Sequence, residues 1–211
     1  GRWSVKSYDD FIAEKFTRHV PTGIADPGEL PACLFPFQRP LVRLALQRGR
    51  CALFDNTCLG KTIQELAWAQ AVAEYTQKPV LILCPLAVAA QTARLGGEYG
   101  IACTRADDGS EVVADKPGIY VTNYDKLHRF DTSIFGGVVL DESSILKSSD
   151  GATRKALTEA FADTPFKLVA TATPAPNDWT ELAQQAAFLG IRTREEMLAE
   201  FFVHDGGTTQ D

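Results

Sequence analysis

The sequence predicts an α/β fold in which a mainly parallel sheet carries helices on both faces. Five short runs of aliphatic and β-branched residues recur along the chain, at 51–54, 80–84, 119–122, 137–141 and 167–171. Strands that are apolar on both faces are typical of parallel sheets. Helix-like stretches at 61–76, 87–98, 151–162 and 178–189 separate them. Strand, helix and strand in alternation predict right-handed crossovers, with ligands bound at the carboxyl ends of the strands.

Length and composition allow one ordinary globular domain with a small appendage. The chain has 211 residues, of which 45% are hydrophobic and 23% are charged. This excludes disordered, collagen-like and coiled-coil chains. The longest apolar runs fall far short of the ~18 residues that a membrane span needs, so we expect no membrane partner. The formal net charge of −6 argues against a protein that coats nucleic acid by bulk charge.

The cysteine pattern and the first residues of the chain indicate the cellular compartment of the protein. Five cysteines form no CxxC pair, and an odd number at wide spacing fits a reducing compartment better than a disulfide framework. No basic-then-apolar start resembles a signal peptide. We therefore expect a cytoplasmic protein.

Residues 1–34 are predicted to be a helical extension and connector, ahead of a main domain at 35–211. The run "YDDFIAEKF" has helical apolar spacing at Phe11, Ile12 and Phe16. The Pro- and Gly-rich "PTGIADPGELP" then interrupts the chain. A further helix pattern in "FQRPLVRLALQRG" ends at Gly49.

A phosphate-binding loop is predicted directly after the first strand, in "DNTCLGKTIQ" at 55–64. Gly60 allows backbone N–H groups to approach phosphate, Lys61 supplies a cation, and Thr62 offers a hydroxyl to Mg²⁺. The following helix points its positive end at the anion. Asp55 stands where the full pattern has glycine, so the loop is imperfect. The loop residues expected to line the same site are Asn56, Thr57, Cys58 and Leu59.

Two further strands end in residues that suit a nucleotide site. Asp141 and Glu142 end the run "VVLDE", where an Asp suits Mg²⁺ binding and a Glu suits activation of water. The alternative for this pair is a solvated acidic turn. Thr171 and Thr173 follow the last strand in "TATPAPND" and offer hydroxyls at the same edge of the sheet.

Gln38 precedes the predicted loop in "FPFQR". Its amide offers a donor and an acceptor, which can pair with the edge of adenine. The alternative, a surface Gln beside a packed Phe, stays open on spacing alone.

These segments together resemble a known family. The strings "LFPFQRPLVRLAL", "LFDNTCLGKTIQ", "LILCPLAVAAQTARL", "IYVTNYDKL", "VVLDESSILKSSDGATRKAL" and "LVATATPAPND" occur in the order of motifs Q, I, Ia, Ib, II and III of the superfamily-two helicases. The string "DESSILK" is similar to the Swi/Snf version of motif II. The resemblance is to Swi/Snf-type DNA translocases in their phage and prokaryotic form, and it runs from about Phe35 to Leu189. It implies that the expected cytoplasm is that of a bacterial or phage-infected cell.

The resemblance implies a RecA-like P-loop ATPase lobe, the first of two, that uses ATP and Mg²⁺. It implies adenine recognition by Gln38, phosphate binding by the 56–62 loop and metal binding by Thr62 and Asp141. It makes Glu142 the general base, with Lys61 assisting catalysis, and assigns coupling of hydrolysis to movement to the two threonines. The residues that fall where the family tracks a nucleic acid, with double-stranded DNA favoured, are Pro85, Gln91, Asn123 and Tyr124.

Three departures from the family pattern limit what the chain is expected to do alone. Cys58 replaces a glycine, which predicts weakened nucleotide binding. Ser143 and Ser144 replace Ala-His in motif II. The sequence to Asp211 contains no second lobe, which in this family carries the arginine finger. We therefore expect the isolated lobe to be nearly inactive. The alternative is a degenerate, non-hydrolysing RecA-like module that binds DNA or a protein partner.

Overall fold

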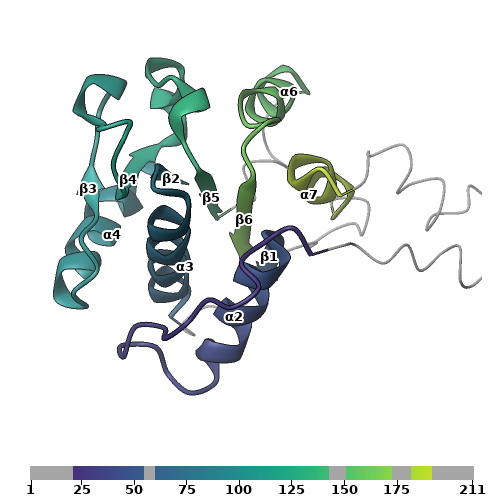
Figure 1. Cartoon of the computed structure of the whole chain (residues 1–211). Coiled ribbons are helices and arrows are strands. Elements are labelled where there is room, and N and C mark those ends of the chain that lie inside the picture. The colour runs from purple at the N-terminus through teal and green to yellow at the C-terminus, as the bar shows by residue number, and fades with distance from the viewer. Residues whose placement is uncertain (1–20, 55–59, 143–150, 173–181, 192–211) are drawn as a thin grey trace, which may run out of the picture.

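The core of the structure is a six-stranded sheet in which every pair of neighbouring strands is parallel (Figure 1). It is a computed structural model that describes residues 21–54, 60–142, 151–172 and 182–191. The strand order is β1-β6-β5-β2-β4-β3. The strands are β1 (Arg50–Phe54), β2 (Pro79–Cys84), β3 (Thr104–Arg105), β4 (Gly118–Asn123), β5 (Gly137–Asp141) and β6 (Phe166–Thr171). The predicted α/β fold with a mainly parallel sheet is therefore confirmed.

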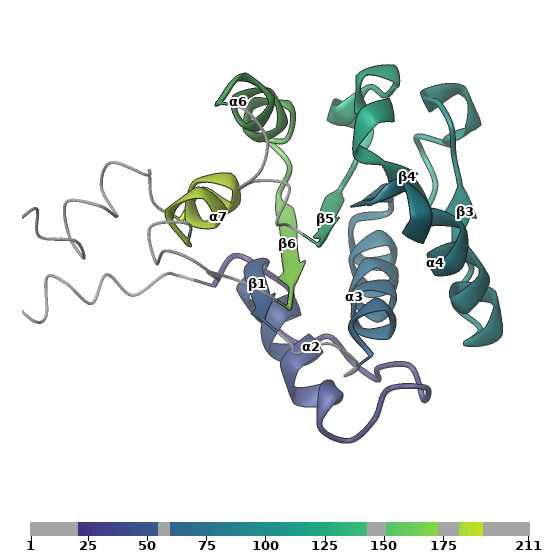
Figure 2. The ribbon, with the colours of Figure 1, turned by 180° about the vertical axis from the view of Figure 1, so that it is seen from behind.

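Helices cover both faces of the sheet (Figures 1 and 2). One face carries α2 (Gln38–Arg48), α3 (Lys61–Thr76) and α4 (Leu86–Glu98), and the other carries α6 (Gly151–Ala160) and α7 (Leu182–Leu189). Each face has its own hydrophobic core, and β2 contributes to both because its side chains alternate. Val80 and Ile82 lie in the core under α3, whereas Leu81 and Leu83 lie in the core under α6 and α7.

The predicted elements agree with the observed ones to within one or two residues where both can be compared. The predicted strand at 137–141 and helix at 61–76 have the observed bounds, and the helix predicted at 151–162 ends at Ala160. β3 and the 3₁₀ helices η1 (Gly109–Glu111), η2 (Tyr124–Arg129) and η3 (Thr132–Ile134) were not predicted. Both residues of β3 are exposed, so no apolar pattern marks it. The start of the helix predicted at 178–189, and the helix predicted near residues 9–16, lie outside the described residues.

The connector at 21–34 packs into the main core. Ile24, Leu30 and Leu34 are buried in the same cluster as residues of α2 and α3. Backbone N–H groups of Gly23 and Ile24 donate to Gln47 and Leu46 at the end of α2. The described part of the connector is therefore held against the helix that precedes β1.

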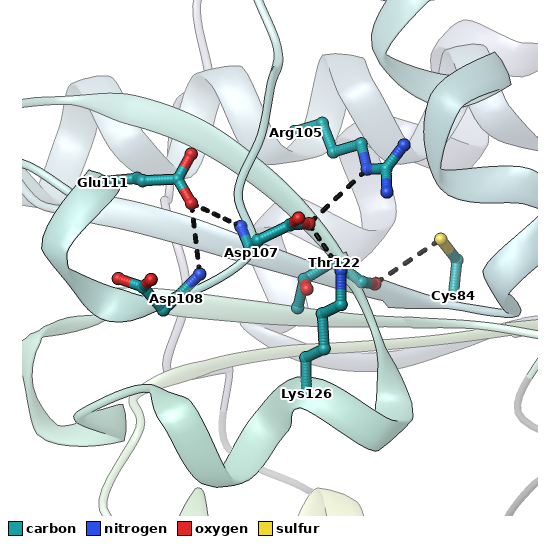
Figure 3. Close-up of polar contacts among 7 residues, drawn as sticks. All are labelled: Cys84, Arg105, Asp107, Asp108, Glu111, Thr122 and Lys126. Atoms are coloured by element: carbon teal, nitrogen blue, oxygen red, sulfur yellow. Dashed lines mark hydrogen bonds and ion pairs between the residues drawn. The ribbon is translucent and has the colours of Figure 1, made fainter.

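A polar cluster ties the segment after β3 to the segment after β4 (Figure 3). The Asp107 carboxylate accepts from Lys126 Nζ at 2.6 Å and pairs with Arg105 at 3.7 Å. The bond from Lys126 holds the pKa of Asp107 below its usual value. The Glu111 carboxylate in turn accepts from the backbone N–H groups of Asp107 and Asp108. Because the Arg105 and Asp107 side chains are each about half exposed, their ion pair contributes little to the stability of the fold.

No helix in the described ranges is both long enough and apolar enough to cross a membrane.

Candidate functional site

Lysine 61 and the acidic pair at 141–142 meet at one edge of the sheet, although about 80 residues separate them in the sequence. The strands β1, β6 and β5 are adjacent and parallel, so their carboxyl ends lie side by side. Lys61 begins α3, and its Nζ lies 3.6 Å from Glu142 Oε2. The structure therefore brings Lys61 and Glu142 together, and their roles in a nucleotide site stay predictions. Of the predicted loop, Asn56, Thr57, Cys58 and Leu59 lie outside the described residues.

Gly60 begins α3 in a conformation that few other residues could adopt. Its φ of 72° and ψ of 41° are left-handed, where a Cβ is strained. A Cβ at this position would also lie 2.7 Å from Gln38 Nε2. Glycine therefore avoids backbone strain here, and any side chain would also have to displace the Gln38 amide. This geometry turns the chain directly into the first turn of α3, with Lys61 and Thr62 at its start.

The Gln38 side chain forms hydrogen bonds with the backbone of this turn and of the segment before α2. Its side chain is fully buried. Its Oε1 accepts from the Phe35 backbone N–H at 3.0 Å, and its Nε2 donates to the Gly60 carbonyl at 3.3 Å. Both ends of the amide thus contact the backbone on either side of the predicted site. The role of Gln38 in adenine recognition stays a prediction. It requires the amide to give up at least one of these two hydrogen bonds and to form one with the base instead.

A buried pair of acids lies beneath Lys61. Asp141 is 7% exposed at the end of β5, and Glu65 is fully buried one turn into α3. Burial raises the pKa of Asp141, and the Lys61 charge opposes that rise. Burial, followed by the charge of Asp141, raises the pKa of Glu65 well above its usual value. Two buried carboxyl groups in contact share a proton more readily than they both ionise.

Sequence reasoning missed Glu65. The available signal was an acid inside the apolar helix run "ELAWAQAVA", because a lone acid in a run that reads as buried needs a partner.

Glu142 is turned back over the sheet edge by an unusual backbone angle. Its φ is 51°, one of two positive values among the described non-glycine residues. Such a conformation costs roughly 1 kcal/mol or more and is often found at functional sites. Its Oε1 accepts from Thr171 Oγ1 at 3.2 Å, and its Oε2 faces Lys61. The side chain therefore bridges α3 and the end of β6. Thr173 lies outside the described residues.

The residues predicted to contact nucleic acid lie after β2 and β4, but they differ in exposure. Gln91 is exposed on α4, and Pro85 precedes the first turn of that helix. Asn123 is only 6% exposed. The Tyr124 hydroxyl donates to the Asp141 carbonyl at 2.8 Å, which ties the segment after β4 to the acidic pair. Their role as nucleic-acid contacts stays a prediction.

The described residues offer no preformed cage for a metal ion. No group of three or more His, Cys, Asp or Glu side chains among them is arranged to hold one. Thr62 and Asp141 lie at the start of α3 and the end of β5, which both border the same edge. These two could therefore hold a hard cation only together with oxygens from a ligand or water, which is the usual situation for Mg²⁺ beside a phosphate.

Comparison with known proteins gives relatives in sequence. The chain is 30% identical over 174 residues to the mouse "DNA annealing helicase and endonuclease ZRANB3" and 28% identical to the cattle protein of that name. The matched part is 75% of this chain but only 16% of each relative. The chain therefore spans about a sixth of the length of these relatives. No protein-family model matches it.

Solved structures match in fold. The SWI2/SNF2 ATPase core of Sulfolobus solfataricus, solved in complex with double-stranded DNA, superposes with a TM-score of 0.68 and 23% identity over 82% of this chain and 40% of that one. The UvsW helicase of bacteriophage T4 superposes with a TM-score of 0.60 and 17% identity over 87% of this chain and 65% of that one.

Proposed function

We propose that this chain, a RecA-like lobe of the Swi/Snf type in its sequence likeness and its fold, is the ATP-binding lobe of a nucleic-acid-dependent motor. The resemblance predicted from the order of its motifs is confirmed by the sequence relatives and by the fold. ATP binding, hydrolysis and movement on DNA are the parts that we propose.

The observation that carries the proposal is the meeting of Lys61, Glu142 and Thr171 at one sheet edge. Lys61 stands in the first turn of α3, where a helix favours a bound anion. Glu142 lies within 3.6 Å of that lysine and within 3.2 Å of Thr171. A cation for phosphate and an acid that can position water are two of the groups that phosphoryl transfer uses, and the Thr171 hydroxyl orients that acid.

The residues present fit Mg²⁺-ATP. Gly60 leaves no side chain between Gln38 and the turn that faces the anion. Thr62 and Asp141 would hold the metal ion, and Lys61 would hold the outer phosphates. When bound, Mg²⁺ neutralises charge on the phosphate oxygens.

The chain's own residues would then exchange partners. A phosphate that competes for Lys61 removes it from Glu142, and the released carboxylate can orient a water molecule and accept its proton. Because Thr171 donates to the same carboxylate, a change at Glu142 reaches the end of β6. This route links the nucleotide to movement.

DNA and a second lobe are the proposed partners. The matched solved core is described in complex with double-stranded DNA, and the relatives are named as DNA annealing helicases. Exposed polar groups and helix starts after β2 and β4 can contact phosphates without a high net charge. A second RecA-like lobe would supply the cation that completes the reaction. We therefore expect the isolated chain to bind ATP and to hydrolyse it poorly.

Thermal unfolding of the 211-residue chain with increasing Mg²⁺-ATP tests the proposal. A ligand at 100 times its Kd adds about 2.7 kcal/mol to the free energy of unfolding, so the melting temperature should rise with ATP. The rise should vanish in Lys61→Ala. Lys155→Ala is the matched control, because Lys155 pairs with Glu159 on exposed α6.

Each outcome decides between the two functions considered. An ATP-dependent rise in the wild type and in Lys155→Ala, lost in Lys61→Ala, supports the ATPase lobe. If the wild type shows no rise at millimolar ATP but still shifts an electrophoretic band of double-stranded DNA, the degenerate binding module replaces it. A rise that Lys61→Ala retains places the nucleotide elsewhere.

A further inference from the structure

An apolar groove runs along the open edge of the sheet. Its volume is about 400 Å³, and it lies between α2, β1 and α7. Its main lining residues are Leu44, Phe54, Leu182, Ala186, Leu189 and Ile191. Leu44, Phe54 and Ile191 are each more than 40% exposed, which is high for large apolar side chains that lie together. The groove therefore has the character of a surface that something covers.

The strand at the floor of the groove, β1, is also an edge strand of the sheet. β1 pairs with β6 on one side and has no strand on the other within the described ranges. Proteins usually cover or blunt such an edge, because its free N–H and C=O groups invite pairing with other chains. Here β1 also leads into the predicted phosphate-binding loop at 55–59, so its cover bears on the proposed site.

The described chain begins at the rim of this groove. Thr22 Oγ1 donates to the carbonyl of Arg48 at 3.5 Å, and Gly23 N–H donates to the carbonyl of Gln47. Arg48 itself lines the groove. Both views place the first described residues beside β1 and α7 (Figures 1 and 2). Residues 1–20 therefore join the described chain at a point close to the groove.

Part of residues 1–20 has apolar residues at helical spacing. Val5, Tyr8, Ile12 and Phe16 are spaced by three, four and four residues, which places them on one stripe of a helix about 80° wide. Charged residues border this stripe on both sides, Asp9 and Lys15. A helix over residues 5–16 would be about 18 Å long. The five residues of β1 extend over about 16 Å. The stripe and the groove thus match in length and in apolar character.

We propose that residues 1–20 dock in this groove as an amphipathic helix that covers the open edge of β1. Val5, Tyr8, Ile12 and Phe16 face the groove, and Lys6 faces solvent. The segment protects the strand that leads into the phosphate-binding loop. This inference does not depend on nucleotide binding, so it stands or falls separately from the proposed ATPase lobe.

Photo-crosslinking in the full chain tests the contact. Phe16→p-benzoylphenylalanine places a reactive group on the apolar stripe, and Lys6→p-benzoylphenylalanine is the matched control outside that stripe. We expect illumination of the Phe16 variant to give adducts within one chain, at residues 44–54 or 182–191. Adducts at other residues, adducts that join two chains, or no adduct above the Lys6 control would overturn the proposal.

Alkylation of Cys51 gives a second measurement. Cys51 is a half-buried lining residue of the groove, and the fully buried Cys84 reports loss of the whole fold. Ile12→Asp combined with Phe16→Asp should make Cys51 react several-fold faster while Cys84 stays protected. Lys6→Asp should change neither.

Two results of the alkylation experiment would count against the proposal. One is an unchanged rate at Cys51 in the double variant. The other is acceleration only by Phe201→Asp, which would assign the groove to residues 192–211. If the double variant unfolds and exposes Cys84, the crosslinking result alone decides.

Discussion

Glu142→Gln should strengthen ATP binding, although it removes the proposed general base. In the structure Lys61 faces Glu142 at 3.6 Å, so a phosphate must compete with that carboxylate for the lysine. Glutamine keeps the shape and can still accept from Thr171, but it carries no charge. Lys61 then has no competing carboxylate partner at this position, and the negative phosphates are repelled by one charge fewer.

The magnitude follows from the exposure of the pair. The Lys61 side chain is 15% exposed and the Glu142 side chain is 38% exposed, so solvent screens their attraction. Pairs of this kind contribute about 1 kcal/mol or less. Because 1.4 kcal/mol corresponds to a tenfold change in affinity, the Kd for Mg²⁺-ATP should fall by up to about fivefold.

Equilibrium titration with a fluorescent ATP analogue measures this Kd directly and does not require hydrolysis. Glu159→Gln is the matched control, since Glu159 pairs with Lys155 at 3.7 Å on exposed α6, and its Kd should equal that of the wild type. A weaker Kd in Glu142→Gln, with the control unchanged, would refute the reasoning, because Glu142 would then assist binding rather than compete with it.

Two further predictions concern stability. Burial lowers the pKa of Lys167 from 10.5 to about 8, so between these values the unfolded chain holds more protons than the folded one and stability rises with pH. Relative to Lys167→Met, the wild type should gain about 3 kcal/mol from pH 7 to pH 11, measured by urea unfolding under reducing conditions; a flat difference contradicts the assignment. Gln38→Ala should lower the free energy of unfolding by about 2–4 kcal/mol, because it leaves the Phe35 N–H and the Gly60 carbonyl without their partner. A loss below 1 kcal/mol by the same method would mean that water replaces the amide.

The sheet could be predicted from the sequence because its central strands are apolar on both faces. All residues of β2, β5 and β6 are buried, and runs of this kind leave a clear trace in the sequence. The positions of Lys61 and Asp141 followed from the same reasoning, since polar residues directly after parallel strands must share an edge. The strand order was not predicted, because it depends on contacts between distant segments.

Features that depend on side-chain packing could not be predicted. Glu65 reads as an ordinary helix residue until β5 brings Asp141 against it. Gln38 offers the same amide to a base or to a backbone, and only the approach of α2 to Gly60 decides which groups it contacts in the structure. β3 has two exposed residues and is defined by its pairing with β4 alone.

The contacts of Glu142 suggest an order of steps at the proposed site, in which phosphate binding comes before the activation of water. The Glu142 carboxylate faces Lys61 with one oxygen and accepts from Thr171 with the other, so both oxygens are engaged before a nucleotide binds. In the proposed ATPase lobe, a bound phosphate would take Lys61 away, and the oxygen that faced the lysine could then orient a water molecule. The Thr171 contact would remain and would connect Glu142 to the end of β6. If the chain is the proposed motor lobe, the Lys61–Glu142 ion pair would hold the acid before the nucleotide binds, and its loss would pass the signal of binding to β6.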